Sequence, residues 1–334
     1  MIVLITGVAG FIGFHTAKCY LDEGHVVVGI DNLNDYYDPL LKVSRLLELG
    51  VIYDNTLVIN LSNKYNFKFI KADISDWSSW ELLKQFEITD VIHLAAQAGV
   101  RYSLINPNAY IQSNIVGFQF LLNFCSDLNI SQILYASSSS VYGKNSIQPF
   151  VESEDCSMPE SLYAATKRAN ELMAYSFFKT KGITSIGLRF FTVYGPWGRP
   201  DMAPMLFAKA ALKSESIDIF NNGNQSRDFT YIDDITNGIL LTHKALKENK
   251  ILGAEVMNIG RGEPVELMVF IENLELLFNV KLYKNFKEAQ LGDVTETYSN
   301  TSKLNNLTGY KPKVDLNVGL KYFVDWYKDY YKCL

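Results

Sequence analysis

The sequence predicts an α/β fold: a doubly wound, Rossmann-like parallel sheet with a second, smaller mixed α/β lobe. Two observations lead to this prediction. Short apolar runs alternate with segments of helical periodicity through the first half of the 334-residue chain. The first run ends in Gly7-x-x-Gly10-x-x-Gly13, and a helical pattern begins there. Sheets of this kind bind ligands beyond the carboxyl ends of their strands, where the strand order reverses.

Each element of the large sheet follows from its own apolar pattern. Short, continuous apolar runs predict buried strands at 2–6, 26–30, 67–70, 91–94, 133–136 and 185–189. Apolar residues at a spacing near 3.6 predict helices at 14–23, 77–86, 109–128 and 162–180. The stretch 34–66 is longer than a sheet connection needs, and we expect a helix at 39–49 followed by a surface excursion.

The pattern changes after Arg189. Residues 191–202 are rich in glycine, proline and aromatics and predict an ordered loop, while strands are expected at 229–231 and 256–259. The smaller lobe is predicted to hold elements at 205–213, 217–220, 265–277 and 280–283 and a helix at 316–328. The predicted division is therefore interleaved: residues 1–190 plus about 226–262 in one domain, and about 191–225 plus 263–334 in the other.

Composition excludes several classes of protein. The 31 basic and 36 acidic residues give a net charge of −5, so a nucleic-acid partner is not expected. The chain has no run of about 18 apolar residues, and its apolar start lacks a basic region, so no membrane partner is expected. The cysteines form no CxxC pair and no metal-ligand spacing, which predicts a cytoplasmic protein without a metal: Cys19, Cys125, Cys156 and Cys333.

The glycine turn has the features of a dinucleotide site. Gly7 permits the tight turn, Gly10 lets the backbone approach a diphosphate, and Gly13 lets the helix pack on the strand. The helix start at Phe11 and Ile12 then offers free N–H groups to the phosphates.

The second strand ends at Asp31, 18 residues after Gly13. A carboxylate there accepts hydrogen bonds from ribose hydroxyls and repels a 2′-phosphate, which favours NAD over NADP. Further cofactor contacts are expected after other strands and beside this carboxylate: Asn32, Asp73, Ile74, Leu94, Ala95 and Ala96.

A candidate chemical centre follows in Tyr163-Ala-Ala-Thr-Lys167, where the two ionisable groups lie one helical turn apart. A phenol titrates near pH 10, and a nearby ammonium together with a nicotinamide cation would lower that pKa. The run Ser137-Ser-Ser-Ser140 ends the preceding strand, where one hydroxyl can bind the oxygen undergoing redox. This combination is more specific than any of its motifs alone.

At this point the chain resembles the extended short-chain dehydrogenase/reductase family and, within it, the nucleotide-sugar epimerases, above all the UDP-glucuronate 4-epimerases of capsule and O-antigen clusters. The strings that carry the resemblance are GIDNLNDYYD (29–38), HLAAQAGVRYS (93–103), YASSSSVYG (135–143), SLYAATK (161–167), LRFFTVYGPWGRPDMA (188–203) and RDFTYIDD (227–234).

The resemblance implies an isomerase that reversibly inverts C4 of a UDP-sugar with tightly bound NAD. Tyr163 would be the general base and acid, Lys167 its partner, and Ser138 the hydroxyl that shares the proton. Bound NAD would take the C4 hydride, and the 4-keto intermediate would turn over before the hydride returns. The first domain would then hold NAD, and the second would hold the nucleotide sugar.

The strand-end serines bear on the type of reaction. Related 4,6-dehydratases carry an Asp-Glu pair where this chain has Ser139-Ser140, and the decarboxylases keep a Glu at the second position. Elimination needs a carboxyl acid, so these hydroxyls argue against both reactions.

The sugar is expected to be UDP-glucuronate, converted to UDP-galacturonate. Hydroxyls of Ser138, Ser139, Ser140 and Thr192 would receive its C6 carboxylate, where neutral-sugar epimerases usually carry Asn in place of Thr192. Positive charge nearby would come from Arg101 or Arg199, although a surface salt bridge is an equal alternative for Arg101.

The resemblance also implies contacts to the nucleotide and to a second subunit. Arg227 is expected at the diphosphate and Asp293 at the uridine ribose. Helices 109–128 and 162–180 would pair with their copies in a homodimer, or else belong to the ordinary core.

Three alternatives stay open. The first is the same chemistry on UDP-glucose or UDP-N-acetylglucosamine. The second is an oxidoreductase or lyase acting on the same sugar. The third is a non-catalytic NAD-binding protein, which retention of Tyr163, Lys167 and Ser138 disfavours.

Overall fold

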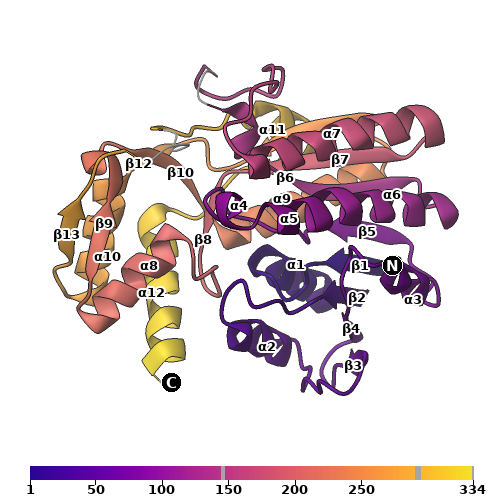
Figure 1. Ribbon diagram of the computed structural model, residues 1–334, viewed down its shortest axis with the longest axis horizontal. Helices are drawn as coiled ribbons and strands as arrows, with labels where there is room; N and C mark the ends of the chain where they lie inside the picture. The colour runs from indigo at the N-terminus through magenta and orange to yellow at the C-terminus, as the bar shows by residue number, and fades with distance from the viewer. Residues whose placement is uncertain (144–146, 290–294, 333–334) are drawn as a thin grey trace.

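The computed structural model describes residues 1–143, 147–289 and 295–332. An eight-stranded sheet with the order β11-β7-β6-β5-β1-β2-β4-β3 forms its larger part (Figure 1). All its pairings are parallel except that of β3 with β4, so the predicted doubly wound sheet is confirmed. Its strands are β1 (Ile2–Thr6), β2 (Val26–Asp31), β3 (Ile59–Leu61), β4 (Phe67–Lys71), β5 (Asp90–His93), β6 (Gln132–Ser138), β7 (Thr184–Phe190) and β11 (Ala254–Ile259).

Helices cover both faces of this sheet. One face packs against α3, α6 and α7 through a core that includes Trp80 and Phe118. The other face packs against α1, α9 and α11 through a core that includes Phe14 and Ile239 and continues into the smaller lobe. These helices are α1 (Phe11–Asp22), α3 (Trp77–Leu83), α6 (Gly117–Asp127), α7 (Leu162–Lys181), α9 (Ile232–Lys247) and α11 (Ser302–Thr308).

The helix expected at 109–128 is divided. It begins as α5 (Pro107–Tyr110), continues through a π-helical stretch at Ile111–Val116, and ends as α6. Two more helices complete this lobe, α2 (Pro39–Glu48) and α4 (Tyr102–Ile105). No helix in the part of the chain that the structure describes is long and apolar enough to cross a membrane.

The smaller lobe contains a three-stranded sheet, β12-β10-β8, and a two-stranded sheet, β13-β9 (Figure 1). Its strands are β8 (Thr192–Tyr194), β9 (Ser216–Ile219), β10 (Ser226–Tyr231), β12 (Pro264–Glu266) and β13 (Tyr283–Phe286). Its helices are α8 (Ala203–Lys213), α10 (Leu267–Phe278) and α12 (Leu316–Lys332). Short 3₁₀ turns occur at Ser139–Tyr142 and Phe220–Gly223.

Several expectations about the second half were wrong. The 191–202 segment is not all loop, because β8 pairs in parallel with β10. The element expected at 280–283 lies later, as β13. Helix α9 was not predicted, since threonines, a glycine and a histidine interrupt its apolar stripe, yet its Thr242 and His243 are buried.

Strand β10 lies in the smaller lobe, whereas the predicted division of the chain placed it in the larger one. Residues 226–262 were assigned to the larger domain, but β10 pairs with β8 and β12 in the smaller sheet. Helix α9 and strand β11 do return to the large sheet. A further return, which the prediction did not allow for, comes from α11, which packs against α9 and β11 before the chain ends in α12.

One core position gives a test of this packing. Phe118 on α6 is fully buried, and its ring lies 5.5 Å from His93 and 5.1 Å from Tyr135. We expect Phe118→Ala to lower the free energy of unfolding by about 3–5 kcal/mol, because it removes this burial and leaves a cavity. Denaturant titration followed by circular dichroism measures the change. The exposed neighbour Gln119 supplies the control, with Gln119→Ala expected to stay within about 0.5 kcal/mol.

Candidate active site

A cavity of about 360 Å³ lies at the carboxyl ends of the central strands, where the order reverses between β1 and β5. Its size suits a ligand larger than a single sugar or base. The predicted site residues that line it are Gly7, Gly10, Phe11, Ile12, Gly13, Asp31, Asn32, Ile74, Leu94, Ala95, Ala96, Ser138, Ser139, Ser140, Tyr163, Lys167, Thr192 and Arg199.

The glycine turn leaves no room for side chains. Gly7 has φ of +70°, and a Cβ there would lie 2.8 Å from the Cα of Ala95. A Cβ on Gly13 would lie 2.1 Å from the carbonyl oxygen of Gly7. Gly10 caps α1 without a side-chain hydrogen bond, so the first N–H groups of the helix have no side-chain cap. This bare helix start fits the diphosphate of a dinucleotide.

Asp31 stands beside this turn. Its Oδ2 accepts a hydrogen bond from the Ala9 amide at 3.2 Å, and its Oδ1 accepts one from the Leu33 amide at 2.9 Å. The carboxylate thus holds the turn while it faces the cavity, which places it to meet a ribose.

Asp73 lies one step away from the cavity. Its side chain accepts hydrogen bonds from Asn32 Nδ2 at 2.9 Å and from Ser75, and it is not among the cavity-lining residues. Asn32 and Ile74 do line the cavity. Asp73 thus lies beside Asn32, which lines the cavity.

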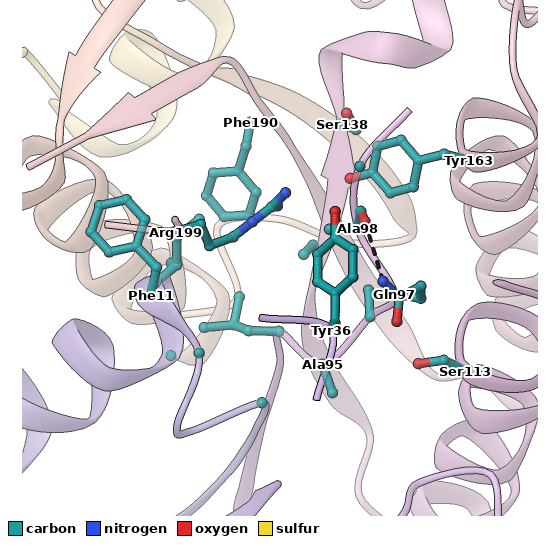
Figure 2. Close-up of a pocket in the computed structure, with 18 of the residues that line it drawn as sticks. Phe11, Tyr36, Ala95, Gln97, Ala98, Ser113, Ser138, Tyr163, Phe190 and Arg199 are labelled. Atoms are coloured by element: carbon teal, nitrogen blue, oxygen red, sulfur yellow. Dashed lines mark hydrogen bonds between the residues drawn. The ribbon is translucent and has the colours of Figure 1, made fainter. Parts of the chain in front are cut away.

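The chemical centre forms where α7 begins. Ser161 caps the helix by accepting the Ala164 amide at 3.1 Å, and this cap starts the turn that carries Tyr163. Figure 2 shows the Tyr163 ring pointing into the cavity next to Ser138. Lys167, only 2% exposed, donates from Nζ to the carbonyl of Ala136 at 2.8 Å.

The electrostatics of this centre differ in part from the expectation. Burial raises the pKa of Tyr163, and the opposing influences are its hydrogen bond with Ser138 and the charge of Arg199, not Lys167. Burial lowers the pKa of Lys167 to about 7, against the carboxylate of Glu171.

The serine run presents hydroxyls to the cavity, with one exception. Ser138 and Ser140 lie 3.1 Å apart through their Oγ atoms, and Ser139 and Thr192 also face the space. Ser137 also lines the cavity, but its hydroxyl donates to Glu171 at 2.7 Å. No carboxylate lines this part of the cavity among the described residues.

Arg199 points into the cavity toward Tyr36 and Tyr163 (Figure 2). Its Nε lies 3.0 Å from Asp201 Oδ1, and the Tyr36 hydroxyl donates to the other oxygen of Asp201 at 3.0 Å. Arg199 therefore adds positive charge to the cavity while it is already held by a carboxylate of the chain.

Two predicted substrate residues, Arg101 and Arg227, are not among the described residues that line this cavity. The Arg101 guanidinium lies 4.9 Å from the ring centre of Phe220. Arg227 donates to the carbonyl of Thr295 at 3.0 Å. Asp293 lies outside the described residues. The described part of the chain holds no group of three or more His, Cys, Asp or Glu side chains that could bind a metal ion.

Some cavity residues were missed from the sequence. Tyr36 and Gln97 lie in strings 29–38 and 93–103, so the resemblance itself was the available signal. Phe190 likewise lies in string 188–203, whereas Ser113 carries no such signal, because only the fold brings its helical segment to this place (Figure 2).

Comparison with known proteins agrees with this geometry. Protein CapI of Staphylococcus aureus is 45% identical, and the alignment covers 99% of this chain and 100% of CapI. UDP-glucuronate 4-epimerase 4 of Arabidopsis thaliana is 44% identical over 98% of this chain and 76% of the plant protein. The structure of UDP-glucuronic acid 4-epimerase from Bacillus cereus in complex with UDP-glucuronic acid and NAD matches with a TM-score of 0.88. That match has 34% identity and covers 99% of this chain and 100% of the other.

The family match spans residues 3–260 and so includes the glycine turn, the strand-end serines and the Tyr163–Lys167 pair. The resemblance drawn from the sequence is confirmed by this match and by the full-length similarity to the relatives above. The chain belongs to the NAD dependent epimerase/dehydratase family.

Proposed function

We propose that this protein is an NAD-dependent isomerase that interconverts UDP-glucuronate and UDP-galacturonate by inversion at C4. The observation that carries the proposal is that Tyr163 and Lys167 line the same cavity as a set of hydroxyl groups. We call this set the hydroxyl wall; it consists of Ser138, Ser139, Ser140 and Thr192. Dehydration or decarboxylation would need a carboxyl acid where Ser139 and Ser140 stand. The similarity to the plant and Bacillus cereus epimerases supports the same choice.

The chain's own residues divide the work of the reaction. Tyr163 Oη takes the proton of the sugar 4-hydroxyl and later gives it back, with the Ser138 hydroxyl as its hydrogen-bond partner. When bound, NAD supplies a reversible acceptor for the hydride at C4. Lys167 is buried one helical turn after the tyrosine, where its ammonium can hold a ribose hydroxyl.

The sugar's C6 carboxylate is assigned to the hydroxyl wall. Ser138, Ser140 and Thr192 can each donate a hydrogen bond to an anionic oxygen. Arg199 contributes charge, but its ion pair with Asp201 limits its freedom to grip the carboxylate as a fork. Single hydroxyl donors hold the group loosely enough for the keto sugar to turn over between the two hydride transfers.

Assembly and cellular context complete the proposal. Leu172 and Tyr175 on α7 are 56% and 52% exposed. Ile111, at the start of the π-helical stretch before α6, is 40% exposed. Covering these apolar side chains with a second copy favours the homodimer. A role in polysaccharide synthesis follows from the resemblance to the epimerases of capsule and O-antigen clusters, and the free thiols of Cys19 and Cys125 suit the cytoplasm.

The reaction is tested by proton NMR of the purified protein with UDP-glucuronate, recorded together with absorbance at the NADH wavelength. We expect a new anomeric signal of UDP-galacturonate and no lasting NADH, because the hydride returns to the same carbon. Turnover of UDP-glucose or UDP-N-acetylglucosamine in place of UDP-glucuronate would refute the carboxylate assignment. Lasting NADH or loss of CO2 would refute the epimerase itself.

Tyr163→Phe tests the proton donor. We expect kcat for C4 inversion to fall by about 10²–10⁴-fold, because the ring stays and only the hydroxyl is lost. Bound NAD, assayed after release by heat, should stay at the wild-type level. Tyr283→Phe, at a 71% exposed position on β13, is the matched control and should keep full activity. An active Tyr163→Phe enzyme would remove this residue from the mechanism.

Gly13→Ala tests the dinucleotide turn. The added methyl group would meet the Gly7 carbonyl, which belongs to backbone and cannot move without opening the turn. We expect NAD copurifying with the protein to fall at least tenfold, measured against the protein concentration. Lys18→Ala, on the exposed side of the same helix, is the control for introducing an alanine into α1 away from the turn. Normal NAD content in Gly13→Ala would place the cofactor elsewhere.

A further inference from the structure

Arg45 on α2 connects three separate segments of the chain. Its side chain is fully buried. Nη1 donates to the carbonyl of Ala9 and to the hydroxyl of Tyr37, both at 2.7 Å. Nη2 donates to the carbonyls of Trp197 at 2.6 Å and of Gly198 at 3.3 Å. One planar guanidinium thus joins two turns that lie about 190 residues apart in sequence.

Both turns belong to the active site. Ala9 lies within the glycine turn, between Gly7 and Gly10, and its amide donates to Asp31. Trp197 and Gly198 immediately precede Arg199, which points into the cavity. Arg45 itself lies in the 34–66 stretch whose length the sheet topology does not require.

The Trp197 turn needs external restraint. Trp197 has φ of +61°, a left-handed conformation that a bulky side chain rarely adopts. Its ring packs 5.7 Å from Phe14 and 5.3 Å from Trp326, so both lobes hold it from outside. The bonds from Arg45 hold the backbone of the same turn. Removing them leaves a strained segment that is held by the packing of its ring and by the hydrogen bond between His15 Nε2 and the Pro196 carbonyl at 2.9 Å.

The charge of Arg45 is also placed for function. Among the described residues it makes no ion pair with a carboxylate, and its Nε has no hydrogen-bond partner. A buried cation held only by neutral groups is costly for a protein. An anionic ligand on the adjacent glycine turn would offset that cost, and the bare start of α1 fits such a ligand.

We propose that Arg45 is a positioning residue that ties the cofactor turn to the turn carrying Arg199. Retention of the dinucleotide and placement of Arg199 then depend on one guanidinium. The catalytic part of this inference rests on the proposed function, whereas the effect on cofactor retention does not.

The test uses the full-length protein as purified with its NAD. Arg45→Met keeps an unbranched side chain that reaches as far as Nε and removes all four hydrogen bonds. Arg45→Lys keeps the charge, but a single ammonium cannot bridge both turns as the planar fork does. Leu46→Ala, at a fully buried position of the same helix, is the control for loss of stability without loss of the bridge.

Two quantities are measured. The first is the rate of NAD release during dilution, followed by trapping the free dinucleotide with a soluble dehydrogenase. We expect release at least fivefold faster in Arg45→Met than in Leu46→Ala. The second is turnover of UDP-glucuronate per NAD-loaded site. We expect kcat to fall about 10–100-fold with KM within about threefold, because small misplacement of reacting groups costs rate more than nucleotide binding.

The outcomes separate the two claims. Wild-type release and kcat in Arg45→Met, or full function in Arg45→Lys, would overturn the positioning role. An equal loss in Leu46→Ala would also overturn it, because instability would then explain the defect. If the wild-type protein does not convert UDP-glucuronate, the proposed function fails, and the release rates still decide the role of Arg45.

Discussion

Close approach of backbone to backbone at the glycine turn is the constraint on which this structure depends. Gly7 touches the segment after β5, and Gly13 touches Gly7, at separations that no side chain would permit. These contacts draw β1, α1 and the end of β5 together at the point where the sheet order reverses. The cavity, the bare start of α1 and the position of Asp31 all follow from that approach.

A second, electrostatic arrangement supports the chemical end of the cavity. Glu171 on α7 is 5% exposed and pairs with Arg189 of β7 through two hydrogen bonds of 2.8 Å. Glu171 also accepts a hydrogen bond from the Ser137 hydroxyl of β6. Helix α7 is therefore tied to β6 and β7 beside Ser138 and Lys167. Burial favours protonation of Glu171, but Arg189 and Ser137 hold its pKa below the usual value. Removing one partner of a buried ion pair strongly destabilises the fold, because the other charge is left buried and unpaired. Replacing both partners with apolar residues costs far less.

The sequence contained most of the cofactor side of the site, because that side is built from consecutive residues. The turn from Gly7 to Gly13 and the strand-end Asp31 are local patterns, and Tyr163 and Lys167 share one helix face. What local pattern could not supply was pairing at long range. Asp73 follows a strand as expected, but its hydrogen bond with Asn32 joins residues 41 positions apart and gives no local sign in the sequence. The strand β8 exists only because β10 pairs with it, and Arg45 gives no sign in sequence of its reach to Trp197.

The repeated passage of the chain between the lobes has a consequence for how this enzyme can diversify. From β7 the chain enters the smaller lobe at β8, returns with α9 and β11, leaves for α10, comes back for α11 and ends in α12. Neither lobe is therefore one contiguous stretch of gene. Exchange of a single DNA segment between relatives cannot transplant a complete sugar-binding lobe onto a foreign cofactor lobe. New substrate preferences in such an architecture must arise through substitutions inside the shared cavity, while both lobes are inherited together.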